Sequence, residues 1–382
     1  MKRTVLMLMS LLFCLCFLSV TVYAEETSPT QEHIQEQLQD SGAEDLQSYL
    51  PEETVDQLSE IGISGVDLSS LSEISAGTIF STIAQTISEK IPAILTAFCA
   101  TLAVLILTAF LNSIKLSLGE QPVGGVIHLV GMLCVVGIIL PPIITCIVEG
   151  AAIISGGAYF MLGCIPILVG ILIAAGQVSA GTSFSALLLT ICNVISFIAS
   201  NWIVPVLNIF LGFSVVSSLS PNLNLNGLCK SIYSIMKWVL GFGMTIFSGL
   251  LSMQGLLGSA VDVTTNKSVK FVVSSFVPIV GTALGEAFGT VHSCAKVLRS
   301  GVGAFGILAI GILFLPIILQ CVLWLMTLSL TAGIGDLFDL KEIAALLRSI
   351  SKVISMLVAI LLCCVAMLII SLEILMMTGG SV

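Results

Sequence analysis

Two short motifs resemble those of proteases that cut inside membranes. Gly333-Ile-Gly-Asp336 spells GxGD, the pattern of aspartyl intramembrane proteases, which need two carboxylates sharing a proton. The other aspartate available, Asp262, lies at the end of a hydrophobic stretch rather than inside it. Gly62-Ile-Ser-Gly65 resembles GxSG of serine proteases, but it lies in an acidic segment without a hydrophobic helix. We therefore interpret both motifs as local turn or span-end sequences.

Other catalytic and metal sites are also disfavoured. The three histidines, His33, His128 and His292, form no HExxH motif, and the sequence has no Walker A, dinucleotide fingerprint, EF-hand or CxxC pattern. The cysteines beyond residue 24 lie in or beside apolar stretches, where free cysteine packs as a small hydrophobe. We expect no enzyme activity, no cofactor and no metal.

A glycine-rich stretch that starts at Pro278 carries the most specific pattern. Gly281, Gly285 and Gly289 are four residues apart, so a helix would place them in one stripe without side chains. Such a stripe lets two helices approach closely inside a membrane. We expect the element over 271–300 to be either a packed helix pair or a broken, partly re-entrant segment that lines a pore.

A carboxylate lies beside this stripe, at Glu286. A charge at membrane depth is costly and usually faces a bundle interior or a water-filled cavity. Lys296 and Arg299 are its candidate charge partners. Other isolated polar groups in apolar surroundings, which we expect to be satisfied contacts or span ends rather than proton relays, are His128, Glu149, Gln177 and Gln254.

The composition indicates the class of protein in which these groups lie. The 382 residues are 57% hydrophobic and 9% charged, with a mean hydropathy of +1.14. Soluble domains carry roughly 45–50% apolar and about 25% charged residues. The chain is therefore predicted to be an integral membrane protein. Nucleic-acid binding is disfavoured because no basic domain is present.

Charge and hydropathy divide the chain into three parts. Residues 1–24 have a basic start, an apolar core and Ala24 at the end, as in a secretory signal peptide; an uncleaved anchor is the alternative. Residues 25–90 hold 14 of the 22 acidic residues and no cysteine, and we expect short extracytoplasmic helices that lie on the membrane part or on a partner. Residues 91–382 form the polytopic membrane domain.

The membrane domain is predicted to be an all-α helix bundle of six to nine spans. Residues 184–219 are interpreted as a helical pair bent near Asn201 to Pro205, and 271–290 is an ambiguous span. In the nine-span topology the segment Gly335 to Lys352 lies outside the cytoplasm. The positive-inside rule gives only weak support for any orientation of the membrane domain. The six clear hydrophobic stretches are roughly 92–112, 125–148, 151–175, 238–261, 302–332 and 353–377.

A short amphipathic segment precedes the last of these stretches. Over 339–352 the apolar residues fall on one helical face and the charged residues on the other. We expect a helix at the membrane interface, with docking on a partner as the alternative.

The chain resembles the stage III sporulation protein AE family of spore-forming Firmicutes. The likeness starts with the signal peptide and an acidic segment that contains Tyr49-Leu-Pro-Glu52. Its most specific part is KFVVSSFVPIVGTALGEAFGTVHSCAKVLRSGVGAFG, from Lys270 to Gly306. The resemblance implies no catalytic residues.

The resemblance implies a permease-like subunit of a channel, or feeding-tube, complex. This complex lies in the mother-cell membrane around the engulfed forespore and keeps the forespore able to express late genes. The implied partners are the ATPase-like, ring-forming and small membrane products of the stage III A operon, a forespore membrane protein reached indirectly, and the lipid bilayer. Two alternatives stay open: a secondary transporter that uses Glu286 or Glu149, and a pure assembly scaffold.

Overall fold

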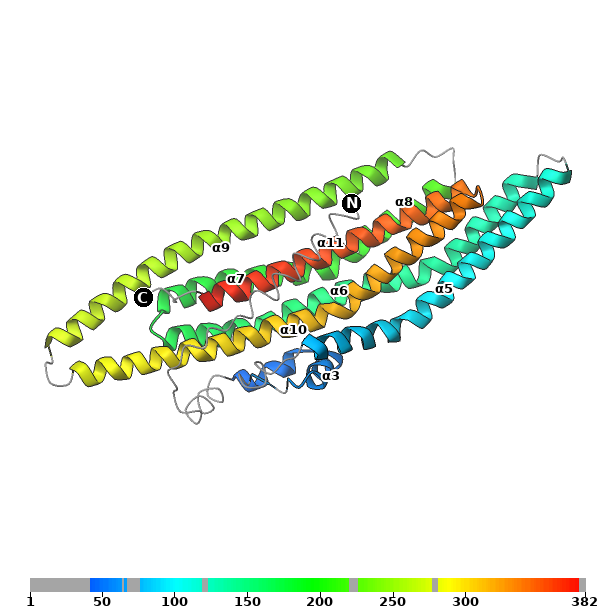
Figure 1. The fold of residues 1–382 in the computed structure, drawn as a ribbon. Coiled ribbons are helices and arrows are strands. Elements are labelled where there is room, and N and C mark those ends of the chain that lie inside the picture. The colour runs from blue at the N-terminus through cyan, green and yellow to red at the C-terminus, as the bar shows by residue number, and fades with distance from the viewer. Residues whose placement is uncertain are drawn as a thin grey trace.

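The computed structural model describes residues 42–63, 65–66, 76–118, 123–219, 226–276 and 281–377, and it gives no side-chain surroundings from 254 to 292. The described part is helical without a strand, which confirms the all-α class. Long helices lie side by side in an elongated bundle (Figure 1). They are α5 (Ala76–Leu118), α6 (Val123–Ala174), α7 (Val178–Ile198), α8 (Val204–Leu219), α9 (Asn226–Phe276), α10 (Gly281–Leu337) and α11 (Lys341–Met377).

Six helical segments of the described chain are long and apolar enough to cross a membrane. This number is the lower end of the predicted six to nine spans. The segments are Ser81–Ile114, Val126–Ala174, Ser185–Leu219, Gly227–Met253, Ser293–Leu337 and Lys341–Met376.

Helix α6 joins two stretches that were predicted as separate spans, 125–148 and 151–175. Glutamate favours a helix and a single glycine costs only about 1 kcal/mol there, so Glu149-Gly150 between them is no stop signal. Pro141 and Pro142 also lie inside the helix, and the Thr145 hydroxyl donates to the Pro141 carbonyl at 3.2 Å. The glycine and proline positions therefore predicted more helix breaks than the structure has.

The predicted bend near Asn201 coincides with a π-helical turn, Ala199–Ile203, which joins α7 to α8. Pro205 has no N–H to donate to the carbonyl four residues earlier, and a π turn is one way in which a helix absorbs such a gap. Asn201 donates its side-chain amide to the Phe197 carbonyl at 3.0 Å. The two halves consequently form one continuous 35-residue segment and not a separate helical pair.

The apolar face of the amphipathic segment 339–352 is buried within the protein. It forms the first turns of α11, and five residues of its apolar face are 0% exposed: Leu340, Ile343, Leu346, Leu347 and Ile350. Asp339 adopts a left-handed conformation (φ 58°), and the Leu340 N–H donates to the Gly335 carbonyl at 2.9 Å. This tight turn folds the apolar face of α11 back onto the protein, where an ion pair between Arg348 and Asp336 spans the hairpin.

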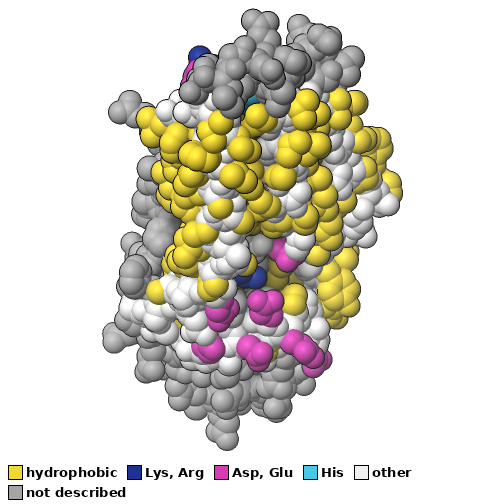
Figure 2. Space-filling view, turned by 90° about the vertical axis from the view of Figure 1, so that its right-hand side faces the viewer, with side chains coloured by type: hydrophobic (Ala, Val, Ile, Leu, Met, Phe, Trp, Pro, Cys, Tyr) yellow, Lys and Arg dark blue, Asp and Glu magenta, His cyan; other side chains and the backbone are white. Residues whose placement is uncertain are grey.

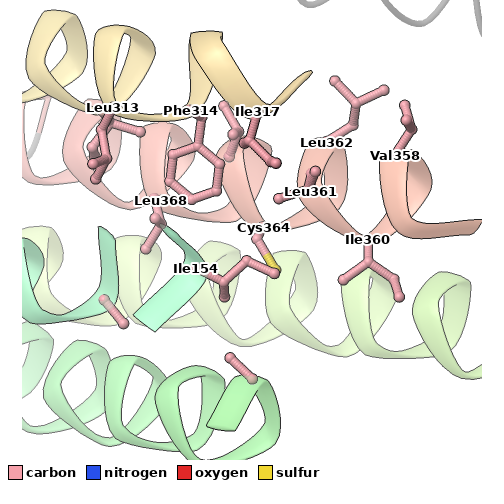
Figure 3. Close-up of a cluster of buried hydrophobic side chains, with 14 of the residues drawn as sticks. Ile154, Leu313, Phe314, Ile317, Val358, Ile360, Leu361, Leu362, Cys364 and Leu368 are labelled. Carbon is pink, nitrogen blue, oxygen red and sulfur yellow. The ribbon is translucent and has the colours of Figure 1, made fainter. Parts of the chain in front are cut away.

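The core lies where α6, α10 and α11 meet. Figure 3 shows Ile154 of α6 beside Cys364 of α11, in one cluster with Leu368 of α11 and with Phe314 and Ile317 of α10. Gly157 lies at this meeting point, and a Cβ there would be 2.7 Å from Phe314 Cε2. The close contact depends on the missing side chain.

Candidate functional site

The glycine stripe and its carboxylate lie at the edge of the described chain. Pro278 is outside the described residues, and Gly281, Gly285, Glu286 and Gly289 form the first turns of α10, but their surroundings are not described. The structure therefore leaves open whether this element packs or lines a pore.

The candidate partners of Glu286 lie further along the same helix. Lys296 is exposed, and Arg299 is buried, at 6% exposure. They follow Glu286 by about 15 Å and about 20 Å along the helix axis, at 1.5 Å per residue. Neighbours on a helix surface are three or four residues apart, so these two cations lie well beyond the nearest-neighbour positions of Glu286.

A partly buried polar junction lies elsewhere, halfway along α6. The Gln320 side-chain amide of α10 donates to Glu149 Oε2 at 3.2 Å, and the same nitrogen lies 3.2 Å from Cys146 Sγ. The thiols of Cys146 and Cys321 lie close together and are fully buried. The junction thus ties α6 to α10 by polar contacts inside an apolar bundle.

Helix α5 brings a cation to the same level. Thr108 packs directly against Gly131, where a Cβ would lie 2.6 Å from Thr108 Oγ1. In an antiparallel pair with this register, Lys90 and Glu149 are equally far from that contact, so they lie at the same height. A carboxylate, an amide, two thiols and an ammonium group therefore come from three helices.

This junction can hold helices together or exchange a proton, but it lacks the elements of a hydrolase or a metal centre. Within the described residues no group of three or more metal-ligating side chains gathers. Sequence reasoning had singled out Glu149 but missed its partners. The signals were the three-residue spacing of Cys146 and Glu149, which puts them on one helix face, and the polar Gln320 in an uncharged run.

The remaining isolated polar groups differ in their surroundings. His128 Nδ1 is buried and has no hydrogen-bond partner among the described residues. Gln177 is buried at the start of α7. The side chain of Gln254 lies outside the described part of the structure.

Replacing Gln320 by leucine is expected to lower the free energy of unfolding by about 1–3 kcal/mol, because Glu149 then loses its donor. The double variant Glu149→Leu/Gln320→Leu should recover most of this loss, since replacing both partners by apolar groups is nearly neutral. Unfolding in mixed micelles, titrated with denaturing detergent, measures both values. Additive losses in the double variant would show that the two side chains are not coupled.

A second feature is a docked segment at residues 42–63 and 65–66, which we call the strap. It contains a 3₁₀ helix (Ala43–Tyr49) that contacts α6, and the short helix α3 (Glu52–Glu60), which contacts α10. Leu46, Leu58 and Ile63 are almost completely buried. The strap therefore shares the core of the membrane domain.

The outer face of the strap is acidic. Figure 2 shows acidic side chains gathered at the lower end of a largely hydrophobic face, at the height where Figure 1 shows α3. The exposed carboxylates of the strap are Asp45, Glu52, Glu53, Asp56 and Glu60. Burying apolar residues on one side while exposing carboxylates on the other indicates that this side lies in water.

An aromatic contact fixes the strap. The Tyr49 ring lies over Gly163 of α6, where a Cβ would be 2.8 Å from the ring carbons, and its centroid is 5.6 Å from that of Tyr159. Tyr49 begins the Tyr49-Leu-Pro-Glu52 motif, and Pro51 precedes the first turn of α3. Only glycine at position 163 leaves room for this ring.

Comparison with known proteins points to one family. A family model described as stage III sporulation protein AE matches residues 67–379, which is nearly all of the chain after the strap. A curated relative, stage III sporulation protein AE of Bacillus subtilis (strain 168), is 27% identical over 148 residues. That alignment covers 39% of this chain and 37% of the relative, so it spans well under half of either protein. No solved structure matches.

Proposed function

Because the chain belongs to the stage III sporulation protein AE family, we propose that it is a permease-like integral subunit of the channel complex between mother cell and forespore. The complex acts after engulfment and sustains gene expression in the forespore. The observation that carries this proposal is the family match over a bundle in which six described segments are long and apolar enough to cross a membrane.

The complex would supply what the chain lacks in sequence. The sequence has no Walker A motif, so energy for transport would come from the ATPase-like partner. The proposed location is the mother-cell membrane around the forespore, with the N-terminal segment outside the cytoplasm. The strap would then face the space between the two membranes. There its carboxylates would meet the ring-forming subunits.

A secondary transporter of a small solute is the second candidate. The polar junction favours it, because Glu149 is a carboxylate held by Gln320 among apolar helices. This candidate predicts solute uptake by the purified chain in liposomes, and uptake that Glu149→Gln or Glu286→Gln abolishes. The channel-subunit proposal predicts no uptake by the chain alone.

The proposal is tested by a clean deletion in the spore-forming host. We expect normal vegetative growth and a loss of heat-resistant spores after engulfment, restored by a copy expressed in the mother cell only. A growth defect on particular nutrients with a normal spore count would contradict the proposal and support the transporter.

A further inference from the structure

Helix α9 contains the least buried of the six described segments that are long and apolar enough to cross a membrane, Gly227–Met253. Figure 1 shows α9 at one edge of the bundle, and it contacts α7, α8, α10 and α11. On its packed face the Tyr233 ring lies 6.5 Å from the Phe210 ring of α8, and Phe247 and Leu251 are buried. The rest of the circumference of this segment is open.

A second face of the segment is apolar and exposed along its whole length. Its side chains follow each other at the spacing of one helix face and are 42–65% exposed: Leu228, Ile235, Trp238, Val239, Phe242, Ile246, Leu250 and Met253. A continuous apolar face on a segment of this length is suited to lipid. This face therefore indicates that the segment lies at membrane depth.

The third face of the segment is polar, and we call it the polar face. Its exposed residues follow each other by three or four positions once Gly241 is counted: Lys230, Ser234, Lys237, Thr245, Ser248 and Ser252. At 100° per residue this face is turned by about 120° from both the packed and the apolar face. The polar and the apolar face consequently share the same range of depth.

The charges of this region all lie on the polar face. From 150 to 261 the sequence contains only two charged residues, Lys230 and Lys237, and no acidic one. Lys237 follows Gly227 by about 15 Å and precedes Met253 by about 24 Å along the helix axis. A lysine so far inside a spanning segment usually faces a bundle interior or a water-filled cavity. In the single chain Lys237 is exposed, so other chains have to enclose such a cavity.

We propose that the polar face of α9 lines a water-filled path for small anions, and that neighbouring subunits close this path in the assembled complex. The inference rests on the proposed function, because a single chain leaves the face open. Serine and threonine hydroxyls give hydrogen bonds to a passing solute, and lysines in a pore favour anions over cations. The expected solutes are therefore small carboxylates and phosphates.

The first test compares cysteines on the two open faces at matched depth. Ser248→Cys is paired with Ile246→Cys, and Ser234→Cys is paired with Ile235→Cys. A water-soluble maleimide is applied to membranes of sporulating cells, and mass spectrometry quantifies labelling at each introduced position in variants with normal protein levels. We expect labelling at least 10-fold faster on the polar face in both pairs. Equal rates on the two faces would overturn the proposal.

The second test addresses the preference for anions. At Ser234→Cys, which lies between the two lysines, reaction rates are measured with a negatively and a positively charged methanethiosulfonate. The ratio of the two rates should fall at least 5-fold when Lys230→Gln/Lys237→Gln is added. Lys341→Gln is the control, because this exposed cation is paired with Asp339 and lies on another helix, and it should leave the ratio unchanged. A ratio that does not respond to the double variant would overturn the anion preference.

The third test separates this inference from the proposed function. In a strain without the ring-forming operon products the labelling contrast between the faces should fall at least 5-fold, because the path loses other walls. A contrast that persists there would overturn closure by those subunits. If a deletion of this chain blocks spore formation but the two faces label equally, the path is refuted while the channel-subunit proposal stands.

Discussion

Replacing Gly157 by leucine is expected to lower the accumulation of the folded protein at least 10-fold and, with it, the number of heat-resistant spores. Its Cβ would lie 2.7 Å from Phe314 Cε2 and 3.0 Å from Leu368 Cδ1, and three more carbons follow. Overpacking a core costs about 1–3 kcal/mol and sometimes more, against a total stability of about 5–15 kcal/mol. We expect at least a 10-fold drop of the protein in isolated membranes, measured by immunoblot.

The neighbouring residue is the matched control. Gly156 also lies on α6, but a Cβ there would have no atom within 4 Å. Gly156→Leu should keep near-normal protein and spore levels, since leucine is a better helix former than glycine. Equal loss in both variants would mean that the close contact of α6, α10 and α11 is not the cause.

Replacing Gly163 by leucine is expected to release the strap without unfolding the bundle. The side chain would occupy the place of the Tyr49 ring, whose atoms lie 2.8 Å from a Cβ at this position. Leu46 and Leu58 would lose burial together with Tyr49, at about 1.5–3 kcal/mol for each large side chain. Limited proteolysis of the strap in sealed vesicles should become at least 10-fold faster.

Gly170→Leu serves as the control for this change. It lies two turns further along α6, is exposed, and has no atom within 4 Å of an added Cβ. Its strap should be cleaved at the parent rate. If Gly163→Leu were also cleaved at the parent rate, the strap would not depend on the contact between Tyr49 and Gly163.

Composition and periodicity predicted the class of fold because they follow from bulk physical chemistry. A chain with 9% charged residues must be covered by lipid, and backbone groups in lipid are satisfied only in helices or closed barrels. The continuity of α6 could not be predicted in this way. Proline and glycine are tolerated inside such helices when neighbours satisfy the freed backbone groups, so Pro141 and Gly150 gave no reliable stop signal.

The amphipathic start of α11 shows a second limit of prediction from sequence. Its apolar face, which includes Ile343 and Leu347, has the same pattern whether it meets lipid headgroups or protein. The turn at Asp339 decides the outcome, because it folds the face against the protein. The positive φ of Asp339 is a local backbone conformation, and the periodicity of apolar residues does not predict it.

The sequence indicated only one of the two hydrogen-bonded residues of the polar junction. Glu149 was identifiable as an isolated carboxylate, but Gln320 lies 171 positions away along the chain. Their pairing depends on the register between α6 and α10, which the packing at Gly157 fixes. Long-range register is set by side-chain fit over many turns, and no local pattern encodes it.

The central claim, that this chain is a subunit of a multiprotein channel, is tested most directly by affinity purification from sporulating cells. A tagged copy expressed from its native promoter is isolated after engulfment, and its partners are quantified by mass spectrometry against the untagged strain. We predict enrichment of the ATPase-like and ring-forming operon products, and loss of the ring-forming products in Gly163→Leu, which releases the strap, but not in Gly170→Leu. Purification of the chain without those products, together with autonomous solute uptake in liposomes, would contradict the claim.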